Sequence, residues 1–301
     1  MYIGIDIGGS HIGIGAVTSD GKIQKKYKKY TTGYAKHNME KFIEETIISV
    51  LERWEKEEHF VIEKIGIGVP GIVQDNQIKY SVNLGLYNYD LKSKIQNAFP
   101  NVNIQIKNDA KCAALAEKNI GALRDFGDCV FICIGTGIGG AVFYNGKLLV
   151  PKNGPGFEFG HMILKKNGRL CRCGSRGCLE AYSSMRSLKK DIKSKLNIDN
   201  YIEGRKLHSC VVKNLDNEDV KEVIDCYIDN LCVGISNIID IFEPEAICIG
   251  GGFVNYKDIL LSKLKSRMRS SNYIFYKGEI PEILTAKLGN DAGIIGSALF
   301  A

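Results

Sequence analysis

The chain has 301 residues, of which 40 are Lys or Arg and 34 are Asp or Glu, so its formal net charge is +6. Apolar residues make up 45% and charged residues 25%, a balance that excludes a disordered or fibrous protein and allows two ordinary domains or one large one. The small basic excess fits an enzyme that handles phosphorylated anions as well as a weak nucleic-acid binder, and it does not separate the two.

The start of the chain lacks the basic segment and apolar core of a secretory signal, because the first strand pattern begins at Tyr2. The apolar stretch Cys129–Tyr144 contains four glycines and is shorter than the roughly 18 residues that a membrane span needs. We therefore expect a cytoplasmic protein that binds neither a membrane nor a nucleic acid.

The ten cysteines are expected to be thiols, because disulfides are rare in the cytoplasm. Seven of them stand among apolar neighbours and are predicted to be small core residues. These seven are Cys112, Cys129, Cys133, Cys210, Cys226, Cys232 and Cys248.

The first elements in the chain are three strands. Alternating residues predict a strand at Tyr2–Ile7, a tight turn at Gly8–Ser10 and a second strand at Ile12–Thr18. A hairpin turn at Ser19–Gly21 leads into a third strand, Lys22–Tyr30, whose lysines we interpret as a solvated face rather than a binding patch.

The same pattern returns later in the chain. A strand at Cys129–Ile134 precedes the glycine turn Gly135–Gly140, and a strand at Ala141–Tyr144 is followed by an Asn-Gly turn and the strand Lys147–Val150. This duplication predicts two related α/β domains that face each other.

Apolar residues at helical spacing predict four helices, and each prediction includes a boundary signal. The helices are Met39–Trp54 after Asn38, Ala110–Ile120 before Gly121, Val220–Phe242 before Pro244, and Asn290–Phe300 with Asp291. A buried strand at Ala246–Ile249 and a turn at Gly250–Gly252 lie between the last two.

The glycine turns are the first candidate site. Gly135, Gly137 and Gly140 match the dinucleotide fingerprint by letter, but that fingerprint requires a following helix, and here a strand follows. No Walker A sequence is present. Glycines leave backbone N–H groups open to phosphate oxygens, and Ser10 and Thr136 add hydroxyl donors, so two such turns could hold a polyphosphate. One turn alone would be an ordinary hairpin turn.

Two acidic positions accompany these turns. Asp6, at the end of a buried strand beside a glycine turn, is placed to hold Mg²⁺ directly or through water. Asn108 and Asp109 precede an alanine-rich helix, so they are either a simple N-cap or the place of a general base for phosphoryl transfer.

The third candidate site contains three clustered cysteines. Cys171, Cys173 and Cys178 form, with His161, the Cys₃His set of a closed tetrahedral Zn²⁺ site. Such a metal would be structural and would orient the flanking Glu158 and Glu180 toward a ligand. The alternative is a set of reduced surface thiols in an ordinary loop.

These motifs together resemble the ROK family (repressors, open reading frames, kinases). The motifs, in chain order, are Asp6-Ile-Gly-Gly-Ser10, Val69-Pro-Gly71, Asn108-Asp109, Gly135-Thr-Gly-Ile-Gly-Gly140, Glu158-x-x-His161, Cys171-x-Cys-Gly-x-x-Gly-Cys-x-Glu180 and Asp291-Ala-Gly-Ile-Ile-Gly296. The resemblance implies an α/β, two-lobed fold of the actin-like, ribonuclease-H-like ATPase type. It implies a small lobe of residues 1–108, on which a C-terminal helix at about 289–301 packs, and a large lobe of residues 109–288 with the zinc motif.

The resemblance also implies roles for single residues. Asp109 resembles the catalytic base. Sugar ligands are implied at Asn83, Asn108, Asp109, Glu158, His161 and Glu180, and His161 would also bind the zinc ion. Nucleotide-binding positions are implied at Asp6, Gly9, Ser10, Gly135, Thr136, Gly137, Gly250 and Gly251.

Two departures from the family pattern stand out. Ser10-His11 replaces the common Thr-Lys, so a permanent positive charge near the phosphates is missing from that position. Phe157 stands where glycine usually precedes the glutamate, and we expect it to reshape the sugar pocket.

The resemblance therefore predicts an ATP-dependent hexose kinase, with glucose as the expected substrate, Mg²⁺ and a structural Zn²⁺ as cofactors, and a homodimer as the expected assembly. An N-acylhexosamine kinase acting on N-acetylmannosamine or N-acetylglucosamine stays open. A sugar-responsive repressor would carry a helix-turn-helix domain before the first strand, and a catalytically dead sugar-binding module would lack Asp109.

Overall fold

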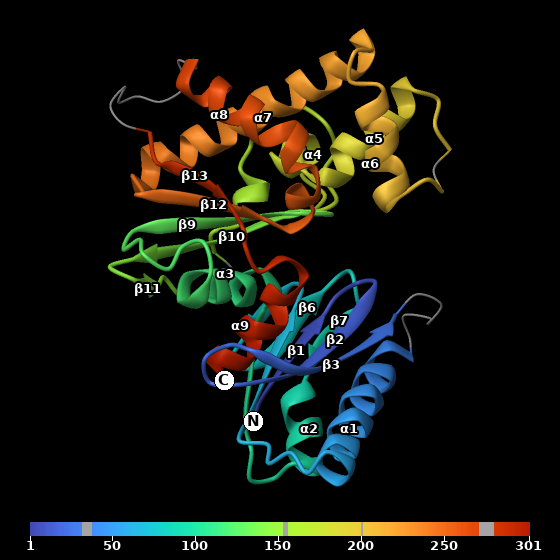
Figure 1. The fold of residues 1–301 in the computed structure, drawn as a ribbon, viewed down its shortest axis with the longest axis vertical. Helices are drawn as coiled ribbons and strands as arrows, with labels where there is room; N and C mark the ends of the chain where they lie inside the picture. The colour runs from blue at the N-terminus through green and yellow to red at the C-terminus, as the bar shows by residue number, and fades with distance from the viewer. Residues whose placement is uncertain (32–37, 153–155, 200, 271–279) are drawn as a thin grey trace. The chain divides into compact units, whose positions relative to one another are not determined.

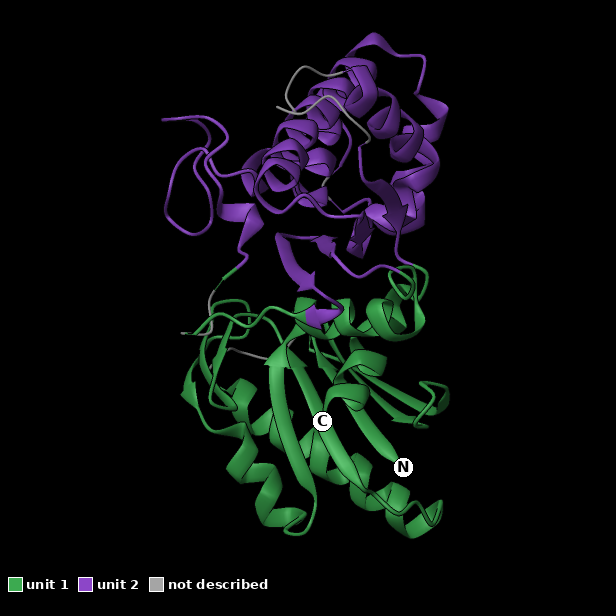
Figure 2. Ribbon diagram, turned by 90° about the vertical axis from the view of Figure 1, so that its left-hand side faces the viewer, with its two compact units in different colours: residues 1–125, 148–156, 287–301 green, residues 126–147, 157–286 purple. Residues whose placement is uncertain are grey.

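The computed structural model describes residues 1–31, 38–152, 156–199, 201–270 and 280–301. The chain forms two compact units, coloured separately in Figure 2. Unit 1 contains residues 1–125, 148–156 and 287–301, and unit 2 contains residues 126–147 and 157–286.

The division into units differs from the predicted boundary between residues 108 and 109. Helix α3 (Asp109–Ile120) belongs to unit 1, because it packs against the C-terminal helix α9 (Ala292–Phe300) and against strand β4 (Lys64–Val69). The candidate base Asp109 therefore lies in the same unit as Asp6.

The main sheet of unit 1 has the strand order β3-β2-β1-β4-β8. Strands β1 (Tyr2–Ile7), β2 (His11–Val17) and β3 (Ile23–Tyr30) are antiparallel neighbours. Strands β1, β4 and β8 (Asn103–Asn108) run parallel, so their carboxyl ends meet at one edge. Alternation along β3 places Lys26 and Lys28 on its exposed face and Lys25 and Lys29 at half-buried positions, so the predicted solvated lysine face is confirmed only in part.

Helices cover both faces of this sheet (Figure 1). Alternate residues of β1, such as Ile3 and Ile5, share a core with α1 (Met39–Glu57) and α2 (Leu91–Ala98). Helix α1 confirms the predicted helix and continues past Trp54, whereas the Asn38 side chain makes no capping hydrogen bond. A small sheet of β5 (Ile72–Gln74), β6 (Gln77–Ser81) and β7 (Leu86–Tyr89) completes the unit.

The sheet of unit 2 repeats the topology of the first, with the order β11-β10-β9-β12-β13. Strands β9 (Cys129–Ile134), β10 (Ile138–Tyr144) and β11 (Lys147–Leu148) correspond to β1, β2 and β3. Strands β12 (Ala246–Gly250) and β13 (Glu282–Thr285) continue the sheet in parallel. The predicted duplication is confirmed, and it extends from three strands to five.

Most of the remaining chain of unit 2 is helical, and α7 and α8 pack side by side (Figure 1). The 3₁₀ and α helices are η2 (Phe159–His161), α4 (Glu180–Ser183), α5 (Met185–Lys195), α6 (Gly204–Lys213), α7 (Glu218–Phe242), η3 (Gly251–Tyr256) and α8 (Lys257–Ser270); unit 1 adds η4 (Gly289–Asp291). Helix α7 confirms the predicted helix and ends at Glu243, whose φ is 42°. Within the described residues, no helix is long and apolar enough to cross a membrane.

The prediction of seven core cysteines is confirmed only in part. The thiols of Cys112, Cys129, Cys232 and Cys248 belong to buried residues, and Cys133 and Cys210 are half-buried. The prediction is wrong for Cys226, because this residue lies on the exposed side of α7.

Helix α9 lies directly on the second face of the unit 1 sheet. A Cβ atom at Gly4 would collide with the carbonyl oxygen of Ile294, and one at Gly66 would collide with that of Ser297. Both glycines are therefore needed for the close approach of a helix backbone to strands β1 and β4.

We predict that Gly66→Ala destabilises the protein by about 3 kcal/mol or more, because the added methyl group pushes α9 off the sheet. Gly135→Ala is the matched control, because a Cβ at Gly135 meets no atom within 4 Å. Urea denaturation of both variants provides the measurement. Equal stability losses in the two variants would contradict the close-approach account.

Candidate functional site

The carboxyl ends of the parallel strands in unit 1 carry the predicted acidic residues. Asp6 is near the end of β1, and Asn108 and Asp109 stand where β8 passes into α3. Strand β4 lies between β1 and β8 in the sheet. In open α/β sheets ligands bind at this edge, so it is a candidate site in unit 1.

Asp6 is held in an unusual electrostatic environment. Burial, reinforced by the nearby carboxylate of Asp109, raises the pKa of Asp6 to about 7, while Lys26 acts in the opposite direction. Gly293 of α9 contributes to the burial, because a Cβ there would lie 2.7 Å from the Asp6 carboxyl carbon. A carboxyl group whose charged form is disfavoured in this way gains strongly from a nearby cation, so Asp6 fits a Mg²⁺ site.

The side chains of Asn108 and Asp109 have different local roles. Asn108 caps α3, because its Oδ1 accepts the Lys111 N–H at 3.2 Å, and its Nδ2 donates to the Gly71 carbonyl at 3.1 Å. Asp109 accepts the Ala110 N–H at 2.8 Å. The helix cap is therefore Asn108, so Asp109 is not needed for that purpose.

The first glycine turn joins β1 to β2. The Gly9 carbonyl accepts a hydrogen bond from Thr31 Oγ1 at 2.9 Å, and Ser10 Oγ lies 3.0 Å from His11 Nδ1. Burial and the ammonium groups of Lys28 and Lys26 lower the pKa of His11, so its ring is neutral at neutral pH. His11 therefore does not supply the positive charge that lysine would bring.

Asn83, a predicted sugar ligand, stands beside this turn. A Cβ added at Gly9 would lie 3.8 Å from the Asn83 Cβ. Unit 1 thus brings Asn83, Gly9 and Ser10 together at one turn, while Asp6, Asn108 and Asp109 lie at the neighbouring strand ends.

The second glycine turn, in unit 2, joins β9 to β10. The Gly135 N–H donates to the Gly137 carbonyl at 2.9 Å, and β10 begins at the next residue, Ile138. A strand follows the turn, which confirms that the dinucleotide fingerprint is absent despite the matching letters. Thr136 is exposed, and the space beside Gly135 is open.

The turn after β12 packs against the same region of unit 2. Gly251 has a φ of 71°, and a Cβ there would lie 2.8 Å from the Ile134 carbonyl oxygen. The carboxyl ends of β9 and β12 are adjacent because these strands pair in parallel. Gly135, Thr136, Gly137, Gly250 and Gly251 therefore line one region, in which the Gly135 N–H is already bonded to the Gly137 carbonyl and the exposed Thr136 can face a phosphate oxygen.

The four predicted zinc ligands come together in unit 2. The ligand atoms of His161, Cys171, Cys173 and Cys178 all lie within 4.8 Å of one another. Cys173 Sγ is 3.7 Å from Cys178 Sγ, and Cys171 Sγ is 3.9 Å from His161 Nδ1. These separations match a tetrahedron with Zn–S bonds of about 2.3 Å, whose edges are about 3.8 Å.

The loop that carries the cysteines is shaped for this cluster. Gly174 and Gly177 have φ values of 89° and 85°, and a Cβ at Gly177 would collide with the Lys165 carbonyl oxygen. The Gly174 N–H donates to the Cys171 carbonyl at 3.0 Å, which closes a tight turn between two of the ligands. The two glycines therefore allow the chain to turn tightly around the cluster.

The three thiols differ in acidity. Burial raises the pKa of Cys171, and burial with hydrogen bonding to Cys173 raises the pKa of Cys178 to about 12. For Cys173 burial acts in the same direction, but hydrogen bonds from the Ser175 backbone and from neighbouring groups prevail and lower its pKa to about 7. At least two protons must therefore leave when a metal binds.

Glu158 and His161 lie at the two ends of helix η2. The His161 N–H donates to the Glu158 carbonyl at 2.9 Å, and both side chains are exposed. A Cβ at Gly160 would collide with the Ile138 carbonyl oxygen, so η2 sits directly on the start of β10. This contact places both residues near the second glycine turn.

Phe157 adopts a backbone conformation that favours glycine, with a φ of 59°. This conformation accounts for the glycine that the family pattern usually has at this position. The Phe157 ring lies 6.5 Å from that of Phe159 and 5.9 Å from that of Phe242, between centroids. These aromatic contacts offset the backbone strain.

Glu180, the last predicted sugar ligand, begins helix α4. Its Oε2 accepts the Ile138 N–H at 2.9 Å, and its Oε1 lies 3.9 Å from Cys171 Sγ. Sequence reasoning missed this link and also missed Met185, whose N–H donates to the Gly135 carbonyl at 3.0 Å. Neither partner could be found from local spacing, since both bonds join residues more than 40 positions apart.

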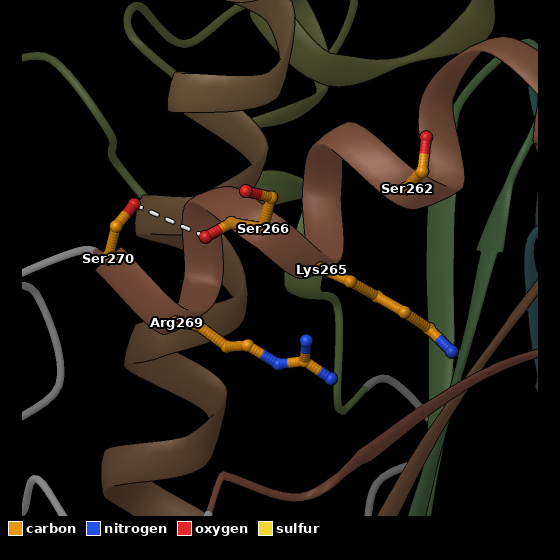
Figure 3. Close-up of a pocket in the computed structure, with 5 residues that line it drawn as sticks. All are labelled: Ser262, Lys265, Ser266, Arg269 and Ser270. Atoms are coloured by element: carbon orange, nitrogen blue, oxygen red, sulfur yellow. Dashed lines mark hydrogen bonds between the residues drawn. The ribbon is translucent and has the colours of Figure 1, made fainter.

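A surface hollow in the described part of the chain lies elsewhere, on α8 (Figure 3). It has a volume of about 420 Å³ and is lined by Ser262, Lys265, Ser266, Arg269 and Ser270. All of these residues come from one helix, and none is a predicted site residue. The chemistry-bearing residues lie instead at the strand ends of the two units.

Comparisons with known proteins agree with these motifs. The ROK family model matches residues 2–301. The chain is 31% identical over 319 residues to a glucokinase of Thermotoga maritima, with 98% of this chain and 95% of the relative covered. It is 28% identical over 318 residues to an N-acetyl-D-glucosamine kinase of Vibrio vulnificus, with 99% of this chain and 98% of the relative covered.

A similar solved structure is that of a ROK family glucokinase from Streptomyces griseus in complex with glucose and AMPPNP. It matches with a TM-score of 0.86 at 27% identity and covers 100% of this chain and 98% of its own. The match confirms the predicted two-lobed, actin-like ATPase fold.

We predict that Asp6→Asn stabilises the magnesium-free protein at pH 8 by up to about 4 kcal/mol and changes its stability little at pH 4. The pKa of Asp6 is about 7 in the folded chain and about 3.9 in the unfolded one. The free energy of unfolding therefore falls as pH rises from 4 to 7, because the folded protein disfavours the ionised form of Asp6. Urea denaturation at both pH values provides the measurement.

The control for this experiment is Asp75→Asn, which changes an exposed carboxylate in the β5–β6 hairpin. It should leave the pH profile as in the wild type. A stability gain in Asp6→Asn that is equal at pH 4 and pH 8 would contradict the proposed environment of Asp6.

We also predict that freshly purified protein contains about one Zn²⁺ per chain. Its zinc affinity should fall as pH drops, by about 100-fold or more per pH unit near pH 7, because the Cys171 and Cys178 thiols release their protons on binding. Elemental analysis and competition with a chelator at several pH values measure both effects. A metal content near zero, with full activity in chelator, would contradict the zinc site.

Proposed function

Because the chain belongs to the ROK family, we propose that it is an ATP-dependent hexose kinase that phosphorylates glucose. The Thermotoga maritima glucokinase supports this proposal, since the similarity covers nearly the full length of both proteins. The Streptomyces griseus structure supports it further, since its two ligands are glucose and an ATP analogue. One observation carries the proposal. Asp109 lies at the start of α3, and its side chain is not required to cap the helix because Asn108 does so.

Asp109 is the proposed general base. Its Oδ1 accepts the Ala110 N–H, and in this proposal the carboxylate takes the proton of a sugar hydroxyl as the hydroxyl oxygen attacks the γ-phosphorus of ATP. The bond from the γ-phosphorus to the bridging oxygen breaks, and ADP leaves. The remaining sugar ligands in this proposal are Asn83, Asn108, Glu158, His161 and Glu180.

The nucleotide is assigned to the glycine turns. In this proposal, Gly9 and Ser10 in unit 1, and Thr136 and Gly137 with Gly250 and Gly251 in unit 2, offer backbone N–H groups and hydroxyl donors to phosphate oxygens. Gly135 contributes by leaving the space beside the turn open, since its own N–H binds the Gly137 carbonyl. Asp6 would hold Mg²⁺, which would supply charge neutralisation for the phosphates. The burial and raised pKa of Asp6 support its assignment as the residue that holds the ion, directly or through water.

The zinc ion has a structural role in this proposal. Three cysteines and one histidine fill a tetrahedral site, so no coordination position remains for substrate. His161 faces the cluster with Nδ1, which leaves Nε2 for a sugar hydroxyl. The homodimer stays a prediction from the family resemblance.

An N-acylhexosamine kinase is the second candidate function. The Vibrio vulnificus relative, an N-acetyl-D-glucosamine kinase, favours it, and this relative is covered as fully as the glucokinase. Phe157, where the family pattern has glycine, is the feature of this chain that bears on the choice, because it directly precedes Glu158, a proposed sugar ligand, and has a φ of 59°.

A coupled assay of ADP formation with glucose, mannose, N-acetylglucosamine and N-acetylmannosamine separates the two candidates. We expect the highest kcat/KM with glucose. A higher kcat/KM with an N-acylhexosamine would replace glucose as the substrate, and sugar binding without ADP formation would favour a regulator.

We predict that Asp109→Asn lowers kcat by about 100-fold or more, because the amide cannot take the hydroxyl proton. The melting temperature should change little, because the amide oxygen can still accept the Ala110 N–H and Asn108 still caps the helix. Steady-state kinetics and thermal denaturation measure both quantities.

The matched control is Asp90→Asn at the N-cap of α2, where the aspartate accepts the Ser93 N–H at 3.0 Å. It should keep the wild-type kcat. Near-normal turnover in Asp109→Asn would show that Asp109 is not the base.

A further inference from the structure

Glu180 connects two features of unit 2 that the proposed function treats as separate. Its Oε2 accepts the N–H of Ile138, the residue that follows the second glycine turn, at 2.9 Å. Gly137 makes room for this contact, because a Cβ there would collide with the same oxygen. The carboxylate therefore lies against the backbone of the turn and not only beside the sugar ligands.

A second bond attaches the same segment to the other end of the turn. The N–H of Met185, which opens α5, donates to the Gly135 carbonyl at 3.0 Å. The segment Glu180–Met185 therefore makes a hydrogen bond at each end of the turn. The Met185 N–H binds the Gly135 carbonyl, and the Glu180 carboxylate binds the N–H of Ile138, the residue after the turn.

This segment is in turn fixed by the cysteine cluster. Cys178 stands two positions before Glu180, and its carbonyl accepts the Ala181 N–H at 3.0 Å. The Cys171 thiol lies 3.9 Å from Glu180 Oε1. Between them, Leu179 is buried against Gly234 of α7. These contacts of Cys178, Leu179 and Cys171 therefore couple the geometry of the cysteine cluster to the position of Glu180.

We propose that Glu180 is a positioning residue that couples the metal cluster to the glycine turn 135–137, so that zinc occupancy sets the affinity for ATP. This inference rests on the proposed function, which assigns the turn to the nucleotide. Oε2 accepts the Ile138 N–H, and Oε1, which the Cys171 thiol approaches at 3.9 Å, is the oxygen that would accept a sugar hydroxyl. Glu180 then also links sugar binding to the geometry of the turn.

The alternative is that Glu180 acts on the sugar alone. In that case, loss of its carboxylate changes sugar affinity and leaves ATP affinity in the absence of sugar as it was. Nucleotide binding without sugar therefore separates the two roles. This comparison does not depend on turnover.

The first experiment is calorimetric titration of the zinc-loaded protein with a non-hydrolysable ATP analogue and Mg²⁺, without sugar. We expect Glu180→Ala to weaken binding about tenfold or more, because a charge-assisted hydrogen bond to the turn is lost. Glu180→Gln should stay within about threefold of the wild type, because its amide oxygen can accept the Ile138 N–H. Unchanged affinity in Glu180→Ala would overturn the inference and leave the proposed function intact.

The second experiment removes the metal rather than the carboxylate. Cys173→Ser should lower the zinc content and weaken binding of the ATP analogue. In a protein that already carries Glu180→Ala, Cys173→Ser should weaken binding of the ATP analogue little further. Both substitutions disrupt the same connection between the cluster and the turn. Cys226→Ser, at an exposed cysteine of α7, is the control and should change neither quantity. Independent, additive effects of Cys173→Ser and Glu180→Ala would overturn the coupling.

A third measurement tests the positioning role without any nucleotide. Hydrogen exchange of the Ile138 amide in the ligand-free protein should become faster in Glu180→Ala and in zinc-depleted wild type, and should be restored in Glu180→Gln. Unchanged exchange in both would overturn the inference. A wild type that binds no ATP analogue would overturn the proposed function instead, and the exchange data would still decide whether Glu180 holds the turn.

Discussion

The direct contact of helix α9 with the unit 1 sheet is the constraint on which the geometry of that unit depends. Gly4 and Gly66 allow the helix backbone to reach β1 and β4, and Gly296 allows it to reach the Cys112 carbonyl in α3. The same helix brings Gly293 against Asp6. The close packing that stabilises the fold is therefore also the packing that buries the carboxylate and raises its pKa.

The duplicated sheets use one topology for two kinds of chemistry. In the first, Asp6 pairs with Gly13 across β1 and β2; at the matching position of the second, Cys133 pairs with Gly139. Each unit thus has a glycine turn, but unit 1 carries the buried carboxylate of Asp6, whereas unit 2 carries the metal cluster. Burial of the Asp6 carboxyl group lowers the stability of the folded protein, and it also strengthens the attraction of the carboxylate for a cation. This combination is expected of a functional residue.

The features of the fold that depend on local sequence patterns were predicted from the sequence alone. The strands around each glycine turn, the duplication and the Asn108 cap followed from alternation and from short-range hydrogen-bonding chemistry. The bond between Ile138 and Glu180 joins residues 42 positions apart and has no local signal. The exposure of Cys226 and the place of α3 in unit 1 depend on tertiary packing, which propensity does not encode. The positive φ of Phe157 could be suspected only from the glycine expected at that position.

In the proposed function, the γ-phosphoryl group of ATP passes to a sugar hydroxyl rather than to water. Phosphorus NMR of a reaction with equimolar ATP and glucose measures this transfer directly, because the phosphate ester and inorganic phosphate give separate signals. We expect a sugar phosphate ester that forms at the same rate as ADP, with little inorganic phosphate. ADP that appears with inorganic phosphate and no ester, or no ADP with any hexose or N-acylhexosamine, would contradict it.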